Sequence, residues 1–154
     1  MEMTAATMQA RMAETVARVL RQACRKWAPP RKIKTRDWAK KYRYLSSIEA
    51  ARPGKYVLDV TPYLAWENSP LDALDDPSVQ VVVCQKSAQV AWTSGVLGNF
   101  LGKSIDAEPS PILVLFPKEG AAKEYMDEKF VPMVEATPAL REKVDTRIRA
   151  QGQR

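Results

Sequence analysis

The stretch from Val79 to Gly95, VQVVVCQKSAQVAWTSG, decides the fold predicted for this chain. Its apolar run from Val79 to Cys84 is typical of a strand buried on both faces of a parallel sheet. A polar loop follows, and apolar residues then recur at helical spacing from Thr93 to Lys103. A strand, a loop and a helix in this order form the setting of a phosphate-binding loop, where N–H groups at a helix start bind anions.

The same order of elements is repeated downstream. The run ILVLF, Ile112 to Phe116, predicts a second buried strand, and Pro117 to Val134 predicts a helix whose end is perturbed by Pro132. Strand, helix, strand and helix with short connections indicate an α/β fold with a parallel sheet. Ligands bind at the carboxyl ends of the strands in such sheets. We therefore expect a site between Gln85 and Trp92.

The loop departs from the usual phosphate-binding motif, G-x-x-x-x-G-K-[ST]. Lys86 and Ala91 stand at its two glycine positions, Trp92 stands at its lysine position, and only Thr93 fits. Lys86 can supply the missing cation from the other side of the loop. If Ala91 needs a positive φ, that conformation costs about 1–2 kcal/mol relative to glycine. On these residues alone, a plain strand, turn and helix remains the alternative.

The N-terminal part of the chain is predicted to be separate from this α/β region. An amphipathic helix is expected within residues 1–30, ended by Pro29-Pro30, and it can pack either on its own domain or on a partner protein. Residues 31–60 read as a basic linker with short elements. Residues 61–145 form the α/β domain, which opens with Thr61 as a helix N-cap. The polar tail, residues 146–154, is expected to fray.

Positive charge is concentrated towards the N-terminus. Of the 24 Lys and Arg residues, 14 lie in residues 1–56 beside four acidic residues, so this part has a net charge of +10. The rest of the chain is net negative, which leaves +6 for the whole chain. The densest block, Arg25 to Arg43, is either a surface for an anionic partner or a solvated linker. The chain has no histidine, which excludes Ser-His and Cys-His catalysis. No apolar run approaches the roughly 18 residues of a membrane span, and we see no signal peptide.

Residues Lys86 to Thr93, KSAQVAWT, resemble the deviant phosphate loop K-S-A-x-V-G-x-[ST] of the lambda-type phage terminase large subunit, the GpA family. They match at every position except Ala91. Further segments agree in order over a resemblance that runs from about Arg36 to Arg141. These are Asp37-Trp38-Ala39, Tyr42-Arg43-Tyr44-Leu45-Ser46, Pro53-Gly54-Lys55-Tyr56, Thr61-Pro62-Tyr63-Leu64, Asp76-Pro77-Ser78-Val79, Pro111-Ile112-Leu113-Val114 and Phe116-Pro117.

The resemblance implies the ATPase of a DNA-packaging motor that uses ATP and Mg²⁺. It makes Lys86 the catalytic, phosphate-contacting lysine and Thr93 the Mg²⁺ ligand. Tyr63 becomes either an adenine-stacking aromatic or a core residue of its own helix. The loop amides that would surround the phosphates belong to Ser87, Ala88, Gln89, Val90, Ala91 and Trp92.

The partners implied by the resemblance are double-stranded DNA, the small terminase subunit at the N-terminal helix, and the phage portal and procapsid, in the cytoplasm of a bacterial host. We find no apolar strand ending in Asp-Glu and no nuclease segment in this sequence. We therefore expect the N-terminal part of such a motor, with weak nucleotide binding and no turnover by itself. A non-catalytic basic module that binds DNA or protein, or an inert prophage remnant, remains the alternative.

Overall fold

The computed structural model describes residues 5–27 and 29–144 of the 154-residue chain. The chain divides into two compact units, residues 1–30 and residues 31–154. The tail that was expected to fray, residues 146–154, lies outside the described residues.

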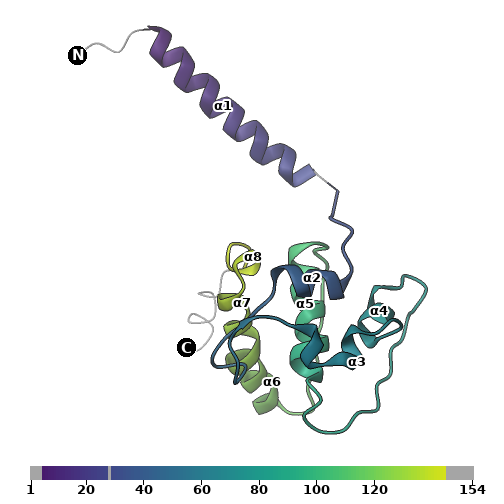
Figure 1. Cartoon of the computed structure of the whole chain (residues 1–154). Helices are drawn as coiled ribbons and strands as arrows, with labels where there is room; N and C mark the ends of the chain where they lie inside the picture. Colours follow the sequence, from purple (N-terminus) through teal and green to yellow (C-terminus); the bar gives the residue numbers. More distant parts are fainter. Residues whose placement is uncertain (1–4, 28, 145–154) are drawn as a thin grey trace. The chain divides into compact units, whose positions relative to one another are not determined.

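Unit 1 is built around one helix, α1, Ala5–Trp27 (Figure 1). A helix thus occupies most of the segment in which the amphipathic helix was predicted. Its apolar side chains at Met12, Val16, Val19 and Leu20 are all more than half exposed. Because apolar side chains at this spacing share one face of a helix, α1 presents an apolar stripe to its surroundings.

Unit 2 is made of short helices and one very small antiparallel sheet, in which Tyr44 pairs with Lys55 and Leu45 with Gly54. Its elements up to the loop are α2 Thr35–Tyr42, β1 Tyr44–Leu45, β2 Gly54–Lys55, η1 Leu58–Val60, α3 Pro62–Ala65 and α4 Pro70–Asp75. Those after the loop are η2 Trp92–Gly98, α5 Asn99–Asp106, α6 Glu119–Tyr125, η3 Met126–Phe130, α7 Val131–Ala136 and α8 Pro138–Arg141.

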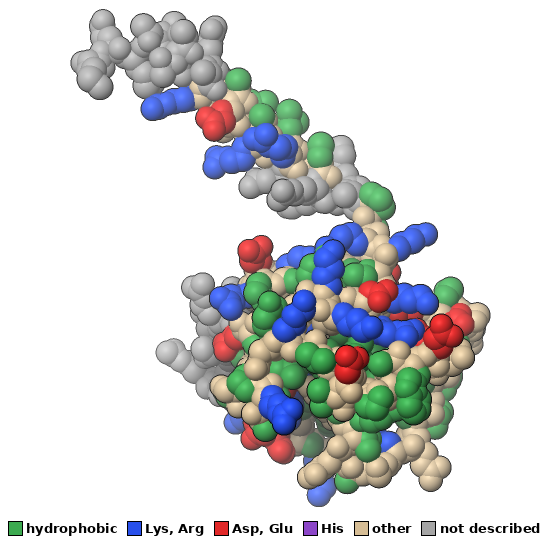
Figure 2. All heavy atoms as spheres, in the orientation of Figure 1, with side chains coloured by type: hydrophobic (Ala, Val, Ile, Leu, Met, Phe, Trp, Pro, Cys, Tyr) green, Lys and Arg blue, Asp and Glu red, His purple; other side chains and the backbone are tan. Residues whose placement is uncertain are grey.

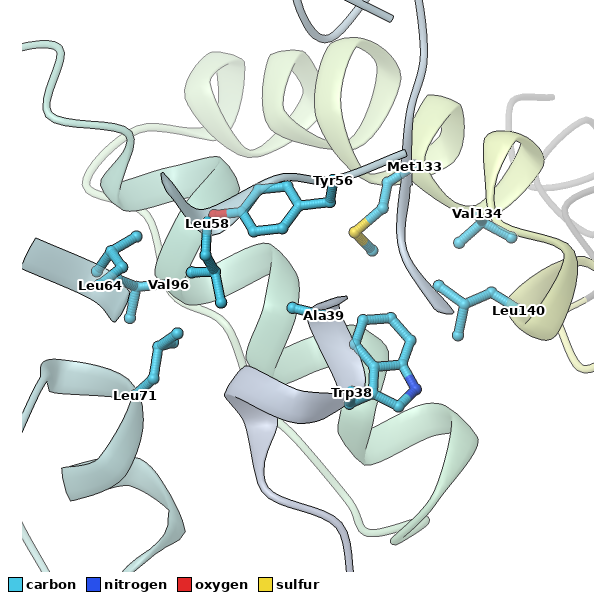
Figure 3. Packing of buried hydrophobic residues seen from close by; sticks show 10 residues of the cluster. All are labelled: Trp38, Ala39, Tyr56, Leu58, Leu64, Leu71, Val96, Met133, Val134 and Leu140. Carbon is cyan, nitrogen blue, oxygen red and sulfur yellow. The ribbon is translucent and has the colours of Figure 1, made fainter. Parts of the chain in front are cut away.

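The core of unit 2 forms where α2 packs against α4 and α5 and where α7 closes over β1. Trp38 of α2 is fully buried, and its indole lies against Gly102 of α5, where the absence of a Cβ lets the two helices approach. The indole N–H donates a 2.9 Å hydrogen bond to Asp106. Figure 3 shows this core, a single cluster of Trp38 with Ala39, Tyr56, Leu58, Leu64, Leu71, Val96, Met133, Val134 and Leu140.

Both helices predicted in the second half of the chain are confirmed, and each contains a π-helical turn. η2 and α5 run without a break, as do α6, η3 and α7. The second π turn, η3, ends at Phe130, two residues before Pro132. Proline has no N–H to donate to the carbonyl four residues earlier, so the helix widens locally instead of ending. The perturbation by Pro132 therefore falls before this residue, inside one continuous helical segment.

The prediction of two parallel strands is wrong for this structure. Residues 79–84 and 112–116 are extended but unpaired, and the connection between α4 and α5 runs around the outside of unit 2 (Figure 1). A strand needs hydrogen-bonded neighbours on its edges, and no described segment supplies them here. Val81 and Leu113 consequently remain 76% and 81% exposed.

The fold class is therefore compatible with α/β in a coarse sense only, as a mainly helical unit with a two-stranded sheet. The short elements near the end of the predicted basic linker are β2 and the 3-10 turn η1. None of the described helices is both long enough and apolar enough to cross a bilayer.

Candidate nucleotide site

The loop between residues 85 and 91 lies directly before η2; residues 85–89 are exposed, and Val90 and Ala91 are half-buried. Gln89 and Ala91 both adopt left-handed backbone conformations, with φ of 56° and 52°. Such conformations are uncommon for residues other than glycine, and they cluster at sites where a backbone is held for function. The positive φ that would make Ala91 costly is thus present.

Several backbone N–H groups of this loop donate no hydrogen bond in the described structure. Within the described part of the chain, no hydrogen bond uses the N–H groups from Ser87 to Ala91. The first bond of the following helix runs from Gly95 N–H to the carbonyl of Ala91, over 2.6 Å. Free N–H groups ahead of a helix, combined with left-handed residues, make an anion-binding concavity.

The side chains predicted for the site lie along this loop. Lys86 is exposed, and its ammonium donates to the carbonyl of Ser87 at 3.5 Å. Thr93 is exposed in the first turn of η2. Tyr63 of α3 reaches the loop from the side, and its hydroxyl donates a 2.5 Å hydrogen bond to the carbonyl of Val90. The structure thus brings Lys86, Thr93 and Tyr63 to one loop.

A cavity of about 890 Å³ opens beside the loop. Residues 89–95 and Lys86 form one side, and the β1–β2 hairpin and η1 form the other. The walls include Leu45, Val57, Val60 and Trp92, which are apolar. A smaller cavity of about 330 Å³ lies on the other side of Lys86, lined in part by Tyr63.

The cavity is strongly positive in character. Four cationic residues line it, Arg52, Lys55, Lys86 and Lys129, against a single acidic residue, Glu49. Two of these cations come from the hairpin and one from η3, so they are far from the loop in the sequence. An anionic ligand is the partner that this lining favours.

Behind the cavity lies a buried polar cluster around Arg43, whose side chain is fully buried. Its guanidinium forms an ion pair with Glu49 and donates to Asn99 over 2.9 Å and to Ser94 over 3.0 Å. Burial lowers the pKa of Arg43, whereas the neighbouring charge of Glu49 opposes that change. The cluster joins the hairpin to η2, so it fixes the helix start that carries Thr93.

The basic block Arg25 to Arg43 divides into two groups in the part that is described. Arg36 and Arg43 are internal, because Arg36 pairs with Asp72 at 2.5 Å and Arg43 is buried. A second group remains exposed on and before α2. It consists of Arg31, Lys32, Lys34, Lys40 and Lys41, and Figure 2 shows Lys and Arg side chains gathered over the part of unit 2 that carries α2.

A comparison with protein families matches residues 50–154 to the phage terminase large subunit gpA, ATPase domain. This chain belongs to that terminase family. No curated protein and no solved structure matches it. The terminase match contains the whole loop, the cations Arg52, Lys55 and Lys129, and the two extended apolar segments.

Several residues of the candidate site escaped prediction from the sequence. Arg52, Lys55 and Lys129 carried no local signal of a shared cavity, because folding alone brings them together. Glu49 and Ser94 were also missed. The charge pattern groups Arg43 with the basic block. In the Tyr-Arg-Tyr stretch, however, it stands between the last residue of α2 and the first residue of the hairpin. That stretch was the one available signal of a special role.

Proposed function

We propose that this terminase chain binds ATP, with the phosphates on the loop Lys86–Thr93 and the remaining part of the nucleotide in the 890 Å³ cavity. One observation carries the proposal: residues 89–91, whose N–H groups are unbonded, four cationic side chains and apolar walls all line the same cavity. A triphosphate with an attached base and sugar has the matching chemistry. The apolar walls of the cavity suit the base, because the aromatic ring of the base can bury its apolar surface against them.

The residues near the loop are compatible with Mg²⁺ as well. No cluster of three acidic or cysteine residues that could hold a metal occurs among the described residues. The hydroxyl of Thr93 and the phosphates would therefore be the main ligands, which is how Mg²⁺ is commonly held in nucleotide sites. Bound there, the ion would neutralise phosphate charge. Lys86 supplies the protein's own positive charge at the same place.

A second arrangement places the adenine in the smaller cavity, where Tyr63 is a candidate for stacking on it, because Tyr63 does not line the 890 Å³ cavity. The hydrogen bond to Val90 keeps its ring beside the loop, at the smaller cavity. Two variants separate the ring from the hydroxyl. Tyr63→Phe removes only the hydrogen bond, whereas Tyr63→Leu removes the aromatic surface, so stacking predicts that only the second variant weakens binding strongly.

We extend the proposal to the motor. The whole protein would drive double-stranded DNA into a procapsid in the cytoplasm of a bacterial host, together with a small subunit that contacts α1 and with a portal. The extended segments 79–84 and 112–116 would be strands of a parallel sheet in that motor. Their apolar, exposed side chains support this, because such side chains are normally covered on both faces of a parallel sheet.

The test is a fluorescence titration of the full chain with a fluorescent ATP analogue and Mg²⁺. Lys86→Ala should weaken binding about tenfold or more, since a charged hydrogen bond to phosphate is removed. Lys118→Ala is the matched control, because Lys118 is exposed and lines neither cavity. Equal binding by the wild type and Lys86→Ala would remove the basis of the proposal.

The exposed lysines of α2 favour a second function, binding of DNA. Lys32, Lys34, Lys40 and Lys41 are exposed, whereas the internal arginines of the same block are not available. Each lysine that no longer neutralises a phosphate should reduce the slope of log K against log[salt] by about 0.9. Changing the four lysines to alanine should flatten that slope for duplex DNA, and Lys86→Ala should leave it unchanged.

A further inference from the structure

Glu49 occupies a special position in the proposed site. It is the one acid that lines the 890 Å³ cavity, and its side chain is only 1% exposed. A single oxygen, Oε1, accepts hydrogen bonds both from Arg43 and from the hydroxyl of Ser94. Its two partners are thus held by the same oxygen.

The second oxygen of Glu49 has nothing to bind. Oε2 is buried and has no hydrogen-bond partner among the described residues, and the same holds for the hydroxyl of Tyr56, which also lines the cavity. A buried acceptor without a donor costs about 1–3 kcal/mol, and more when it is charged. Oε2 has almost no surface open to the cavity, so a donor there reaches it only when the Glu49 side chain turns towards the cavity.

The location of Glu49 indicates which kind of donor would bind Oε2. Ser94 follows Thr93 directly in η2, so the bond from Ser94 to Glu49 ties the carboxylate to the turn that carries the proposed metal ligand. Mg²⁺ held by few protein ligands and by phosphates keeps several waters. Those waters are strong donors, and a carboxylate beside them is a suitable acceptor.

We propose that Glu49 is a positioning residue on the metal side of the nucleotide site, with Oε1 holding Ser94 and Arg43 and Oε2 accepting a hydrogen bond from the hydration shell of Mg²⁺. This inference rests on the proposed nucleotide function. It assigns a role to a carboxylate outside both the phosphate loop and the matched residues 50–154.

The experiment compares the affinity of the full chain for the ATP analogue in Mg²⁺ and in EDTA. The magnesium effect is the ratio of the two dissociation constants. Glu49→Gln should reduce the magnesium effect about tenfold, because a charge-assisted hydrogen bond is removed, and should leave the affinity in EDTA nearly unchanged. The matched control is Asp106→Asn. Asp106 is an equally buried, ion-paired acid that does not line the cavity, so the magnesium effect should survive its removal.

A double variant separates this role from simple pairing with Arg43. Glu49→Gln alone leaves a buried guanidinium without its counter-ion, which destabilises the fold. Arg43→Met combined with Glu49→Gln removes both charges, and a buried pair replaced in this way often keeps or gains stability. If Glu49 serves the metal side, the double variant folds and its magnesium effect stays low. Recovery of the magnesium effect in the double variant would show that Glu49 only neutralises Arg43, and would overturn the inference.

The remaining outcomes are equally decisive. Equal loss of affinity in Mg²⁺ and in EDTA would place the donor on the nucleotide and overturn the metal-side role. A wild type that binds no nucleotide, or binds it as weakly as Lys86→Ala does, would refute the proposed function and this inference with it. Should the double variant not fold, Ser94→Ala replaces it, because this variant keeps both charges and releases the carboxylate from η2. An unchanged magnesium effect in folded Ser94→Ala would then contradict the inference.

Discussion

Replacing Ala91 by glycine tests the geometry of the loop most simply. Ala91 has φ 52° and ψ 22°, a left-handed conformation that costs an L-residue about 1–2 kcal/mol and glycine nothing. Glycine also gains freedom in the unfolded chain, which costs the folded state about 0.5–1 kcal/mol. The difference predicts that Ala91→Gly raises the free energy of unfolding by roughly 0.5–1 kcal/mol. Family loops with glycine at this position would lack that strain.

The assay is urea unfolding followed by circular dichroism, with the slope of the transition checked for each variant. Ala121→Gly is the control, because Ala121 lies inside α6 and should lose about 1 kcal/mol there. The two substitutions should therefore shift the urea midpoint in opposite directions. Loss of the Cβ also gives phosphate closer access to the backbone, so ATP binding should tighten. If Ala91→Gly destabilises the chain as much as Ala121→Gly does, the left-handed loop is refuted.

Three further predictions concern the rest of unit 2. Gly102→Ala should lower the free energy of unfolding by about 1–3 kcal/mol, because a Cβ there meets the ring of Trp38; an unchanged urea midpoint would refute this packing. Burial alone would raise the pKa of Asp106, but its lysine, arginine and indole partners lower the pKa below its usual value. Its stabilisation is therefore present above about pH 4 and is lost as the pH falls through the lowered pKa, so wild-type stability should drop more steeply in acid than that of Asp106→Asn. Changing Val81 and Leu113 together to lysine should reduce light scattering at high concentration without a lower melting temperature, since both side chains are exposed; a large loss of stability would show that they are packed.

The sequence predicted elements whose signal is local. The helix of unit 1 and the helical segments that begin at Trp92 and Glu119 follow from apolar spacing, and the structure contains them. Residues 79–84 and 112–116 have the composition of buried strands, but composition cannot supply the neighbours that a strand must bond to. These segments are extended in the structure and remain unpaired.

The site shows the same division between local and distant information. The loop Lys86–Thr93 was found from its residues, and Ala91 has the positive φ that makes its position difficult. The opposite wall of the cavity, with Arg52, Lys55 and Lys129, could not be predicted, because those residues meet the loop only through the packing of the hairpin and η3. Arg43 shows the limit most clearly. Charge counting placed it on the surface, whereas the fold buries it beside Glu49.

The central claim, that nucleotide phosphates bind on this loop, is tested most directly by amide hydrogen exchange of the full chain with and without ATP and Mg²⁺. The N–H groups from Ser87 to Ala91 are unbonded within the described structure and should exchange quickly in the free chain. The claim predicts that ATP and Mg²⁺ slow exchange over residues 86–95 in the wild type and have no such effect in Lys86→Ala. Unchanged exchange over these residues at a nucleotide concentration that saturates binding, or the same protection in Lys86→Ala, would contradict it.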